Sequence, residues 1–396
     1  MEHISEVLKI LDGALKSNAS LAMNYAGLLA DKLHDQGDRA QARMIRERLA
    51  RAPAAVASAQ DAERGVSFSS LPVDGESRLH TVDVSQPRSE DIHLVLPSAL
   101  ERRVEDFLSG VRHYDQLARV GAALPNRMLV YGPPGTGKTQ LVRWLSAQLS
   151  LPLLTVRCDT LVSSLLGQTS RNLRRVFDYA EHRPCVLFLD EFDALAGARG
   201  NERDVGELQR VVIALLQNMD ALSASTILVA ATNHERLLDA AVWRRFSFNL
   251  PMPLPASDAR RALWGRFLGT MVSEPQTIEE LVAASLGASG ALIEQVSLDA
   301  KRDAVLKRAG LIDVHGLFRR LGISMALAKG VALSTEEEEM QWLRQWQPQV
   351  FTLRALAHLY DTSTRQITNI TKEKADGNSE GSDAASRRKS NRTRHK

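Results

Sequence analysis

MLVYGPPGTGKT, residues 128–139, is the most informative segment of the chain. Four mostly apolar residues precede a loop that fits the template GxxxxGK followed by Ser or Thr at every required position. An amphipathic pattern follows, which gives the order strand, loop and helix. Glycines in such a loop let backbone N–H groups turn toward phosphate oxygens, and the helix N-terminus adds a positive dipole. We therefore expect a phosphate-binding loop rather than a turn that merely ends a strand.

The residues of this loop predict a site for ATP and Mg²⁺ as cofactors. Lys138 is expected to bridge the β- and γ-phosphates, and the Thr139 hydroxyl is expected to ligate the metal ion. The nucleotide-binding residues of the loop are expected to be Gly132, Pro133, Pro134, Gly135, Thr136, Gly137, Lys138 and Thr139.

A second segment, VLFLDEFD at residues 186–193, predicts a buried strand that ends in carboxylates. Open parallel sheets bind their ligands at that end of the strands. Asp190 is expected to hold the Mg²⁺ hydration shell, and Glu191 to polarise a water molecule for in-line attack on the γ-phosphate. A strand that ends in Asp-Glu says little alone. Its spacing from the phosphate loop makes it a second part of one catalytic site.

Three further residues complete the predicted catalytic set. Asn233 ends the apolar segment TILVAATN, where its amide can orient the attacking water. Arg244 and Arg245 follow in LLDAAVWRRF, and their position indicates arginine fingers that reach the γ-phosphate of a neighbouring subunit. The alternative is that both arginines are solvated surface charges.

Apolar and amphipathic segments alternate between the phosphate loop and the arginine pair. Strands are expected at 127–131, 152–157, 185–189 and 226–231. Helices are expected at 139–149, 169–180 and 205–219. This alternation predicts an α/β fold of the P-loop NTPase kind, in which a parallel sheet carries helices on both faces.

The other segments change in composition and so define the predicted domains. The domains expected are a helical N-terminal module at 1–52, a linker at 53–90, an α/β domain at 91–255, a helical segment at 256–308, a helical C-terminal region at 309–372 and a disordered basic tail at 373–396. The family resemblance described next implies that 91–255 is an ATPase domain and that 256–308 is its helical lid.

The segments LVYGPPGTGKT, LFLDEFDAL, GELQRVVIALLQNMD, AATN and LLDAAVWRRF occur in the order and spacing of AAA ATPases. The chain resembles this family over about residues 92–307, especially the subgroup that contains katanin, spastin, FtsH and the proteasomal ATPases. The resemblance implies a homo-oligomeric ring, commonly a hexamer, because arginine fingers need a neighbouring copy and a head-to-tail interface closes by rotation. It also implies that hydrolysis moves the α/β domain against the lid.

The resemblance also implies roles for residues outside the catalytic motifs. GASGALIEQV, residues 287–296, is similar to the second-sensor helix of the lid, although Leu292 stands where many members have Asp. The residues implied in the adenosine pocket are Ile92, His93, Gly290 and Ala291, and those implied in the subunit interface are Arg199, Glu207 and Arg210.

Two departures from the family pattern limit the activities that the resemblance implies. Members that thread a polypeptide place an aromatic residue in the pore loop, whereas this chain has Leu165-Leu166-Gly167. The leucines can grip a polypeptide with less area than a ring, or they can simply pack. HERLL begins like the zinc signature HExxH, but Leu238 replaces the second His, so an FtsH-like protease centre is not expected.

TLRALAHLYDTSTRQITNIT, residues 352–371, resembles a helix-turn-helix, with Asp361 at a turn position often held by Gly. Two interpretations stay open: the unit is a packing element, or Arg365, Gln366 and Asn369 contact DNA. The basic tail that follows either adds a non-specific phosphate anchor or is a solvated end.

The composition of the 396 residues excludes several other classes of protein. Aromatic residues make up only 5%, which argues against an aromatic nucleic-acid-binding sheet. Residues 372–396 carry a net charge of +4, which leaves −1 for the rest of a chain whose total is +3, so a generally basic nucleic-acid-coating protein is disfavoured. Two cysteines predict a reducing, cytoplasmic location, and no apolar run is long enough to predict a membrane helix.

The sequence therefore predicts an AAA ATPase that hydrolyses ATP in a ring and thereby remodels, unfolds or activates a protein client or partner enzyme. Two alternatives of other classes stay open. One is a nucleic-acid-associated ATPase recruited through the C-terminal helices, and the other is a nucleotide-gated scaffold for a partner such as a separate protease.

Overall fold

The computed structural model of the chain describes residues 3–15, 19–50, 82–92, 94–158, 166–196, 205–272 and 274–371. The chain divides into two compact units, Met1–Pro253 and Leu254–Lys396, which are described separately. Three residues with predicted roles, His93, Leu165 and Arg199, lie outside the described residues, as do most of the predicted linker and the predicted basic tail.

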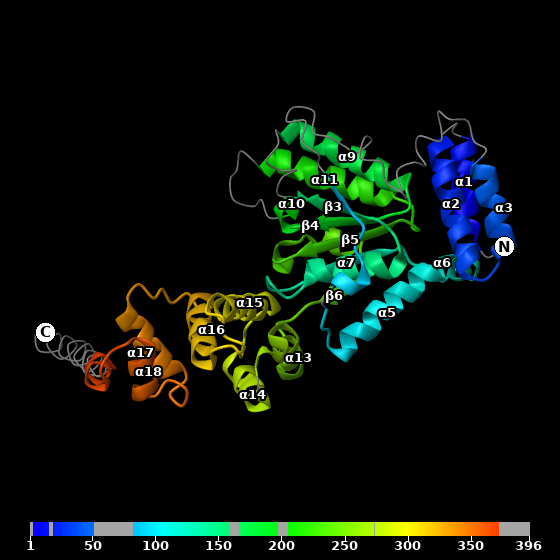
Figure 1. Cartoon of the computed structure of the whole chain (residues 1–396). Coiled ribbons are helices and arrows are strands. Elements are labelled where there is room, and N and C mark those ends of the chain that lie inside the picture. Colours follow the sequence, from blue (N-terminus) through cyan, green and yellow to red (C-terminus); the bar gives the residue numbers. More distant parts are fainter. Residues whose placement is uncertain are drawn as a thin grey trace, which may run out of the picture. The chain divides into compact units, whose positions relative to one another are not determined.

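The first unit contains a six-stranded sheet in the order β1-β3-β4-β5-β2-β6 (Figure 1). The strands are β1 Asp83–Ser85, β2 Arg127–Tyr131, β3 Leu153–Arg157, β4 Val186–Asp190, β5 Ile227–Thr232 and β6 Phe248–Pro251. The pairs β3–β4, β4–β5, β5–β2 and β2–β6 are parallel, which confirms the predicted fold class. Only the edge pair β1–β3 is antiparallel.

Four strands match the predicted segments, whereas β1 and β6 lie outside them. β1 has three residues, too few for an alternating pattern to show, and it lies inside the predicted linker at 53–90. Its register with β3 pairs Val84 with Leu154, so residues 83–85 belong to the sheet. β6 is a half-buried edge strand of four residues that pairs with the strand before the phosphate loop.

Alternating side chains of the strands build two cores, one on each face of the sheet. Leu129 and Leu187 face a cluster that includes residues of α9 and α11, while Met128 and Phe188 face a cluster that includes residues of α5 and α7. The helices of this domain are α5 Ser98–Arg112, α6 Tyr114–Arg119, α7 Lys138–Leu149, α9 Leu166–Glu181, α10 Asp193–Ala196, α11 Val205–Ala221 and α12 Ala240–Trp243, with the 3₁₀ turns η2 Ser89–Asp91 and η3 Glu235–Leu237. This layering explains why the buried strands read as continuous apolar runs.

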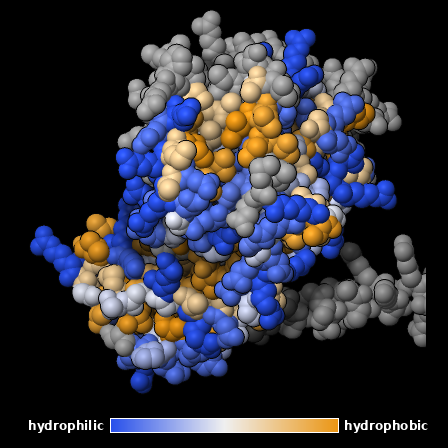
Figure 2. All heavy atoms as spheres, turned by 90° about the vertical axis from the view of Figure 1, so that its right-hand side faces the viewer, coloured by the Kyte–Doolittle hydropathy of each residue, from blue (hydrophilic) through white to orange (hydrophobic). Residues whose placement is uncertain are grey.

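The N-terminal module consists of α1 Ile4–Leu15, α2 Ala19–Asp35 and α3 Arg39–Ala50, and α2 packs against both other helices. Glu6 is buried and pairs with Lys32. Burial disfavours the charge of this carboxylate, but the Lys32 ammonium, together with hydrogen bonds from Ser5 and the backbone, holds the pKa of Glu6 below its ordinary value. On the side of the molecule that carries the module, hydrophobic side chains gather in patches bordered by hydrophilic ones (Figure 2).

The second unit is helical throughout its described residues. Its helices are α13 Ser257–Leu268, α14 Pro275–Ala284, α15 Gly290–Leu306, α16 Val314–Ala328, α17 Glu336–Trp346 and α18 Leu353–Leu359, with η4 Gly269–Met271. Fully buried Trp264 donates its indole N–H to Ser285 Oγ at 3.0 Å. Gly322 allows α17 to approach α16 closely, because an added Cβ would lie 2.5 Å from a methyl carbon of Leu343.

The segment predicted to resemble a helix-turn-helix contains α18, a turn and a helix over residues 364–371. Asp361 adopts a φ of +48° in the turn, and Ile367 packs in the core on the inner face. The Gln366 side chain accepts hydrogen bonds from Thr362 Oγ1 and from the N–H and hydroxyl of Ser363. Gln366 therefore caps its own helix, and its predicted contact with DNA stays a prediction.

Two further findings concern membranes and thiols. Within the described residues, the longest helices are too polar or too short to cross a membrane. Cys158 and Cys185 are both buried and neither forms a disulfide, and burial raises the pKa of Cys185 to about 12.

Candidate active site

The predicted site residues gather where β2, β4 and β5 end at the same edge of the sheet. β2 runs into the phosphate loop, β4 ends at Asp190 and β5 ends at Thr232, one residue before Asn233. The register places these strands side by side, since Tyr131 pairs with Thr232 and Leu189 pairs with Ala230. This is the edge at which open parallel sheets bind ligands.

The glycines of the loop have conformations that other residues rarely adopt. Gly132, Gly135 and Gly137 have φ values of +143°, +74° and +94°. A Cβ on Gly132 would lie 2.2 Å from the carbonyl oxygen of Met252, so this glycine is also required by close approach of the chain after β6. The Gly132 N–H donates to the Thr232 carbonyl at 3.3 Å, which joins the loop to the end of β5.

Lys138 begins α7 and is buried inside the loop. Its ammonium donates to the carbonyl oxygens of Gly132 at 2.7 Å and of Pro133 at 2.8 Å. Burial lowers the pKa of Lys138, although Asp190, Asp193 and Glu235 act in the opposite direction. A phosphate group would supply the negative charge that favours the charged form of this lysine.

Thr139 and Asp190 lie next to each other, as the metal prediction requires. The Thr139 hydroxyl donates to Asp190 Oδ2 at 3.2 Å, and Asp190 Oδ1 accepts the Glu191 N–H at 2.9 Å. A hydroxyl and a carboxylate are the oxygen ligands that Mg²⁺ prefers, so the donor set fits this ion. These two residues would hold Mg²⁺, which when bound neutralises charge on nucleotide phosphates.

Glu191 follows β4 in a left-handed conformation with a φ of +53°, which directs a half-exposed carboxylate away from the strand. Arg157, at the end of the adjacent strand β3, places its guanidinium Nη2 3.9 Å from Glu191 Oε2. Sequence reasoning did not assign a role to Arg157. The register of β3 with β4, which pairs Arg157 with Asp190, is the feature that brings it to the site.

Asp193 is a second residue that the sequence prediction did not include among the site residues. Its Oδ1 accepts the Thr232 hydroxyl at 2.8 Å and the Asn233 N–H at 3.3 Å. Asp193 starts α10, so these bonds join the segment after β4 to the end of β5. The carboxylate therefore positions the backbone that carries Asn233. Asn233 itself is half-buried.

The two predicted arginine fingers differ sharply in their surroundings. Arg245 donates from Nε and Nη2 to the two carboxylate oxygens of Asp220, at 3.0 and 2.9 Å, and from Nη1 to the Ala241 carbonyl. Arg244 is exposed at the end of α12. The preceding residue, Trp243, packs edge-on against Tyr131 with ring centroids 5.2 Å apart. Arg244 thus projects from a short, well-packed helix next to the strand that enters the phosphate loop.

The residues that the resemblance implied in other roles are placed as follows. Ile92 is buried and follows η2, while Gly290 and Ala291 begin α15 in the second unit, where Ser289 caps the helix by accepting the Leu292 N–H. Glu207 and Arg210 lie on α11, and Leu166 and Gly167 begin α9. Their predicted functions remain predictions.

Comparison with known proteins agrees with this geometry. The family described as ATPase family associated with various cellular activities (AAA) matches residues 128–254. An uncharacterized AAA family ATPase of Sinorhizobium fredii is 35% identical over 296 residues, which cover 74% of this chain and 87% of that protein.

Two relatives of named activity match a smaller part of their own length. The ATP-dependent zinc metalloprotease FtsH of Mycobacterium leprae is 32% identical over 237 residues, or 57% of this chain and 30% of that protein. The 26S proteasome regulatory subunit 10B of Dictyostelium discoideum is 38% identical over 149 residues, or 36% of this chain and 38% of that protein. The phosphate loop, the paired carboxylates and the length of the shared sequence lead to one conclusion: the chain belongs to the AAA family of ATPases and is an ATP hydrolase.

Proposed function

We propose that this ATPase works as a homo-oligomeric ring, commonly of six copies in its family, and couples ATP hydrolysis to the remodelling, unfolding or activation of a protein partner. The observation that carries the proposal is the contrast between Arg244 and Arg245. Arg245 is held by Asp220 of its own chain, whereas Arg244 is exposed on the neighbouring position. A guanidinium presented outward on a rigid helix is suited to a phosphate bound by another copy.

Each site residue has a definite task under this proposal. Lys138 binds the β- and γ-phosphates, Thr139 and Asp190 hold Mg²⁺, and Glu191 accepts a proton from the attacking water. Asn233 orients that water, and Arg244 from the next copy stabilises the charge that develops on the γ-phosphate. Arg245 does not contact the phosphate itself. It fixes the end of α11 to the segment that carries Arg244, and so it positions Arg244.

The names of two relatives favour a protein as the partner. One matched relative is a metalloprotease and the other is a regulatory subunit of the 26S proteasome, and both names refer to proteins that act on other proteins. The zinc signature is incomplete in this chain, because Leu238 occupies the position of the second His. We therefore assign the remodelling step, and not peptide-bond cleavage, to this protein.

A subunit-mixing experiment tests the shared site. Lys138→Ala removes ATP binding and Arg244→Ala removes the charge given to the neighbour, so each variant alone should lose at least about 100-fold of the ATPase rate. A mixture of the two should recover part of the activity, because an Arg244→Ala subunit can bind ATP beside a Lys138→Ala subunit that still supplies Arg244. Arg119→Ala, an exposed arginine at the opposite edge of the domain, is the matched control. Two variants that stay inactive when mixed would contradict a shared site.

A second experiment separates remodelling from scaffolding. The ATPase rate of the purified chain is measured with and without a permanently unfolded polypeptide, and the Glu191→Gln variant is tested for ATP-dependent retention of that polypeptide. Remodelling predicts a higher rate in the intact protein and stable retention by the variant, which binds ATP without cleaving it. A rate that does not respond, together with no retention, would favour the scaffold.

A specific feature of the second unit favours one alternative, a nucleic-acid-associated ATPase. The helix over residues 364–371 exposes Arg365 and Asn369, and α18 exposes Arg354. The competing observation is that the Gln366 side-chain oxygen accepts the Ser363 N–H at the start of its own helix. Duplex DNA should raise the ATPase rate under this alternative, and Arg365→Ala should abolish the rise while the basal rate persists. Absence of any rise at low salt would exclude it.

A further inference from the structure

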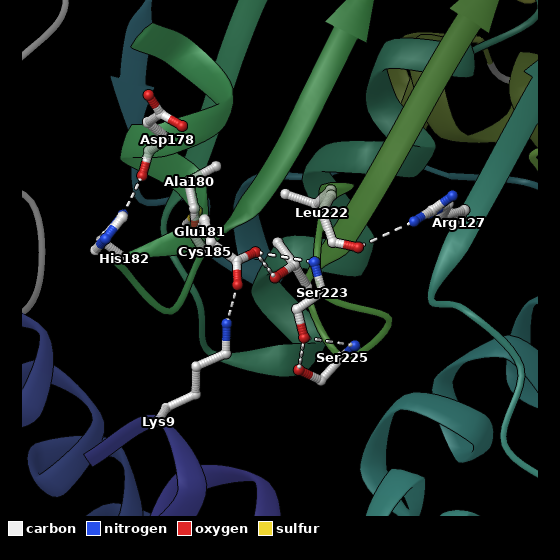
Figure 3. Close-up of polar contacts among 11 residues, drawn as sticks. Lys9, Arg127, Asp178, Ala180, Glu181, His182, Cys185, Leu222, Ser223 and Ser225 are labelled. Carbon is white, nitrogen blue, oxygen red and sulfur yellow. Dashed lines mark hydrogen bonds and ion pairs between the residues drawn. The ribbon is translucent and has the colours of Figure 1, made fainter. Parts of the chain in front are cut away.

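The sheet has a second polar cluster, at the edge opposite the active site, where the N-terminal module meets the ATPase domain. Lys9 of α1 forms an ion pair with Glu181, the last residue of α9 (Figure 3). Glu181 Oε2 also accepts the Ser223 N–H and the Thr226 hydroxyl, both at 3.0 Å. One carboxylate therefore joins three segments: the module, α9 and the connection between α11 and β5.

The surroundings of this ion pair combine burial with incomplete packing. Lys9 is 9% exposed, and its ammonium lies 5.8 Å from the centre of the Tyr25 ring. A cavity of about 500 Å³ lies between the module and the base of the domain, lined by Lys9, Tyr25, Tyr114, Arg183 and Cys185 among others. The Ser5 N–H of the module also donates across this interface, to Asp115 Oδ1 at 3.1 Å.

We expect the module and the ATPase domain to separate at this interface. Polar interfaces between domains of one chain generally permit relative motion, because little apolar surface holds them together. The module keeps its own packing of α1 and α3 against α2, so it can leave as a unit. Residues 51–81 connect it to the sheet, and a chain of that length spans up to about 100 Å when extended.

The anchor point links the interface to the nucleotide edge. α9 has 16 residues, which corresponds to about 24 Å of rigid helix. Thr226 directly precedes β5, and β5 ends at Thr232, whose hydroxyl is held by Asp193 in the active site. A restraint on Glu181 and Thr226 is therefore a restraint on one end of a strand whose other end positions Asn233.

We propose that α1–α3 form a detachable latch, which docks on the base of the ATPase domain through Lys9 and Glu181 and restrains α9 and β5 while docked. The docked latch slows ATP hydrolysis, and undocking releases both elements. The latch is a regulatory device within one chain, and its action does not depend on the identity of any client.

Cys185 provides a native reporter of the docked state. This thiol is buried, and it lines the same cavity as Tyr25 of the module. Departure of the latch exposes this part of the base to solvent. Modification of Cys185 by a maleimide, located by mass spectrometry in the full-length chain, therefore measures undocking without any engineered label.

The experiment compares Lys9→Met with Arg46→Met, which breaks the exposed Arg46–Asp31 ion pair elsewhere in the same module. Lys9→Met should increase the rate of Cys185 modification about tenfold and the basal ATPase rate about threefold, while Arg46→Met should change neither. Glu181→Gln, which keeps an oxygen for Ser223 and Thr226, should act in the same direction. Circular dichroism confirms that each variant is folded.

Two results would overturn the latch. Unchanged modification of Cys185 in both Lys9→Met and Glu181→Gln would show that the module does not detach through this contact. Increased modification with an unchanged ATPase rate would show that docking does not restrain hydrolysis. Increases in both quantities in Lys9→Met and Glu181→Gln, but not in Arg46→Met, would support the proposal.

Discussion

The two edges of the sheet hold charged side chains under opposite conditions. At the nucleotide edge, Lys138 donates to carbonyl oxygens of its own loop, and the Glu191 side chain is 44% exposed. At the base, the Glu181 carboxylate accepts from Lys9, Ser223 and Thr226. The nucleotide edge leaves charge accessible to a substrate, whereas the base neutralises charge with protein partners. Satisfied polar groups stabilise a fold, and accessible charges bind ligands.

The largest expected effect concerns the backbone at the nucleotide edge. Gly132→Ala should destabilise the protein by about 3 kcal/mol, because the new Cβ meets the Met252 carbonyl and the positive φ disfavours it. Gly137→Ala, where the nearest atom is 3.9 Å away, should cost only about 1 kcal/mol. Urea unfolding of both variants measures the difference. Equal stabilities would mean that close approach of the chain after β6 does not constrain the loop.

Asp193→Ala should impair both stability and catalysis at the nucleotide edge, because this carboxylate accepts the hydroxyl of buried Thr232 and also positions Asn233. The Thr232 hydroxyl would lose its acceptor at a cost of about 2 kcal/mol, and kcat should fall about tenfold because Asn233 loses its anchor. Asp178→Ala, which removes an exposed carboxylate paired with Arg174, is the control. A normal kcat in a destabilised Asp193→Ala protein would limit the residue to a structural role.

Thr226→Val tests whether the base is only a structural network or also influences catalysis. Removal of one hydrogen bond to Glu181 should lower the free energy of unfolding by about 1 kcal/mol. The ATPase rate should rise modestly, because the restraint on the start of β5 weakens. The direction is the same as that proposed for undocking of the latch. Thermal unfolding and steady-state hydrolysis report these two effects separately. A fall in the rate would contradict a restraining role of this contact.

Arg157→Met should give the smallest effect. The pair with Glu191 is exposed at both partners and spans 3.9 Å, so its loss should change stability by less than about 0.5 kcal/mol. The rate of hydrolysis should change about twofold, because the guanidinium influences the orientation of Glu191 rather than the chemistry itself. A tenfold or larger loss of kcat, at unchanged ATP affinity, would instead make Arg157 a direct participant.

The sequence was most informative where chemistry imposes a fixed local order. The phosphate loop, the strand that ends at Asp190 and the strand that ends at Thr232 each carry a pattern of apolar residues followed by a defined polar residue. Parallel pairing then brings these ends together without further information. For this reason the fold class and the core of the ATP site were predicted from residues alone.

Contacts between distant segments were not predictable in the same way. Asp220 pairs with Arg245 across 25 residues, and Lys9 pairs with Glu181 across 172 residues. Neither pair produces a periodic pattern in the sequence, because charged residues on helices are common whether or not they have partners. Arg157 was overlooked for a related reason, since its role depends on the register of β3 against β4.

The packing of Trp243 against Tyr131 gives the protein an intrinsic optical signal. The indole lies beside the last residue of β2 and directly before Arg244, so nucleotide entry at the loop should alter its environment, and so should contact from a neighbouring copy in the proposed ring. Trp243→Phe provides the blank that separates its emission from that of the other four tryptophans. Stopped-flow fluorescence can therefore follow substrate arrival in the unlabelled enzyme in real time, and it can test the proposed oligomer formation in the same way.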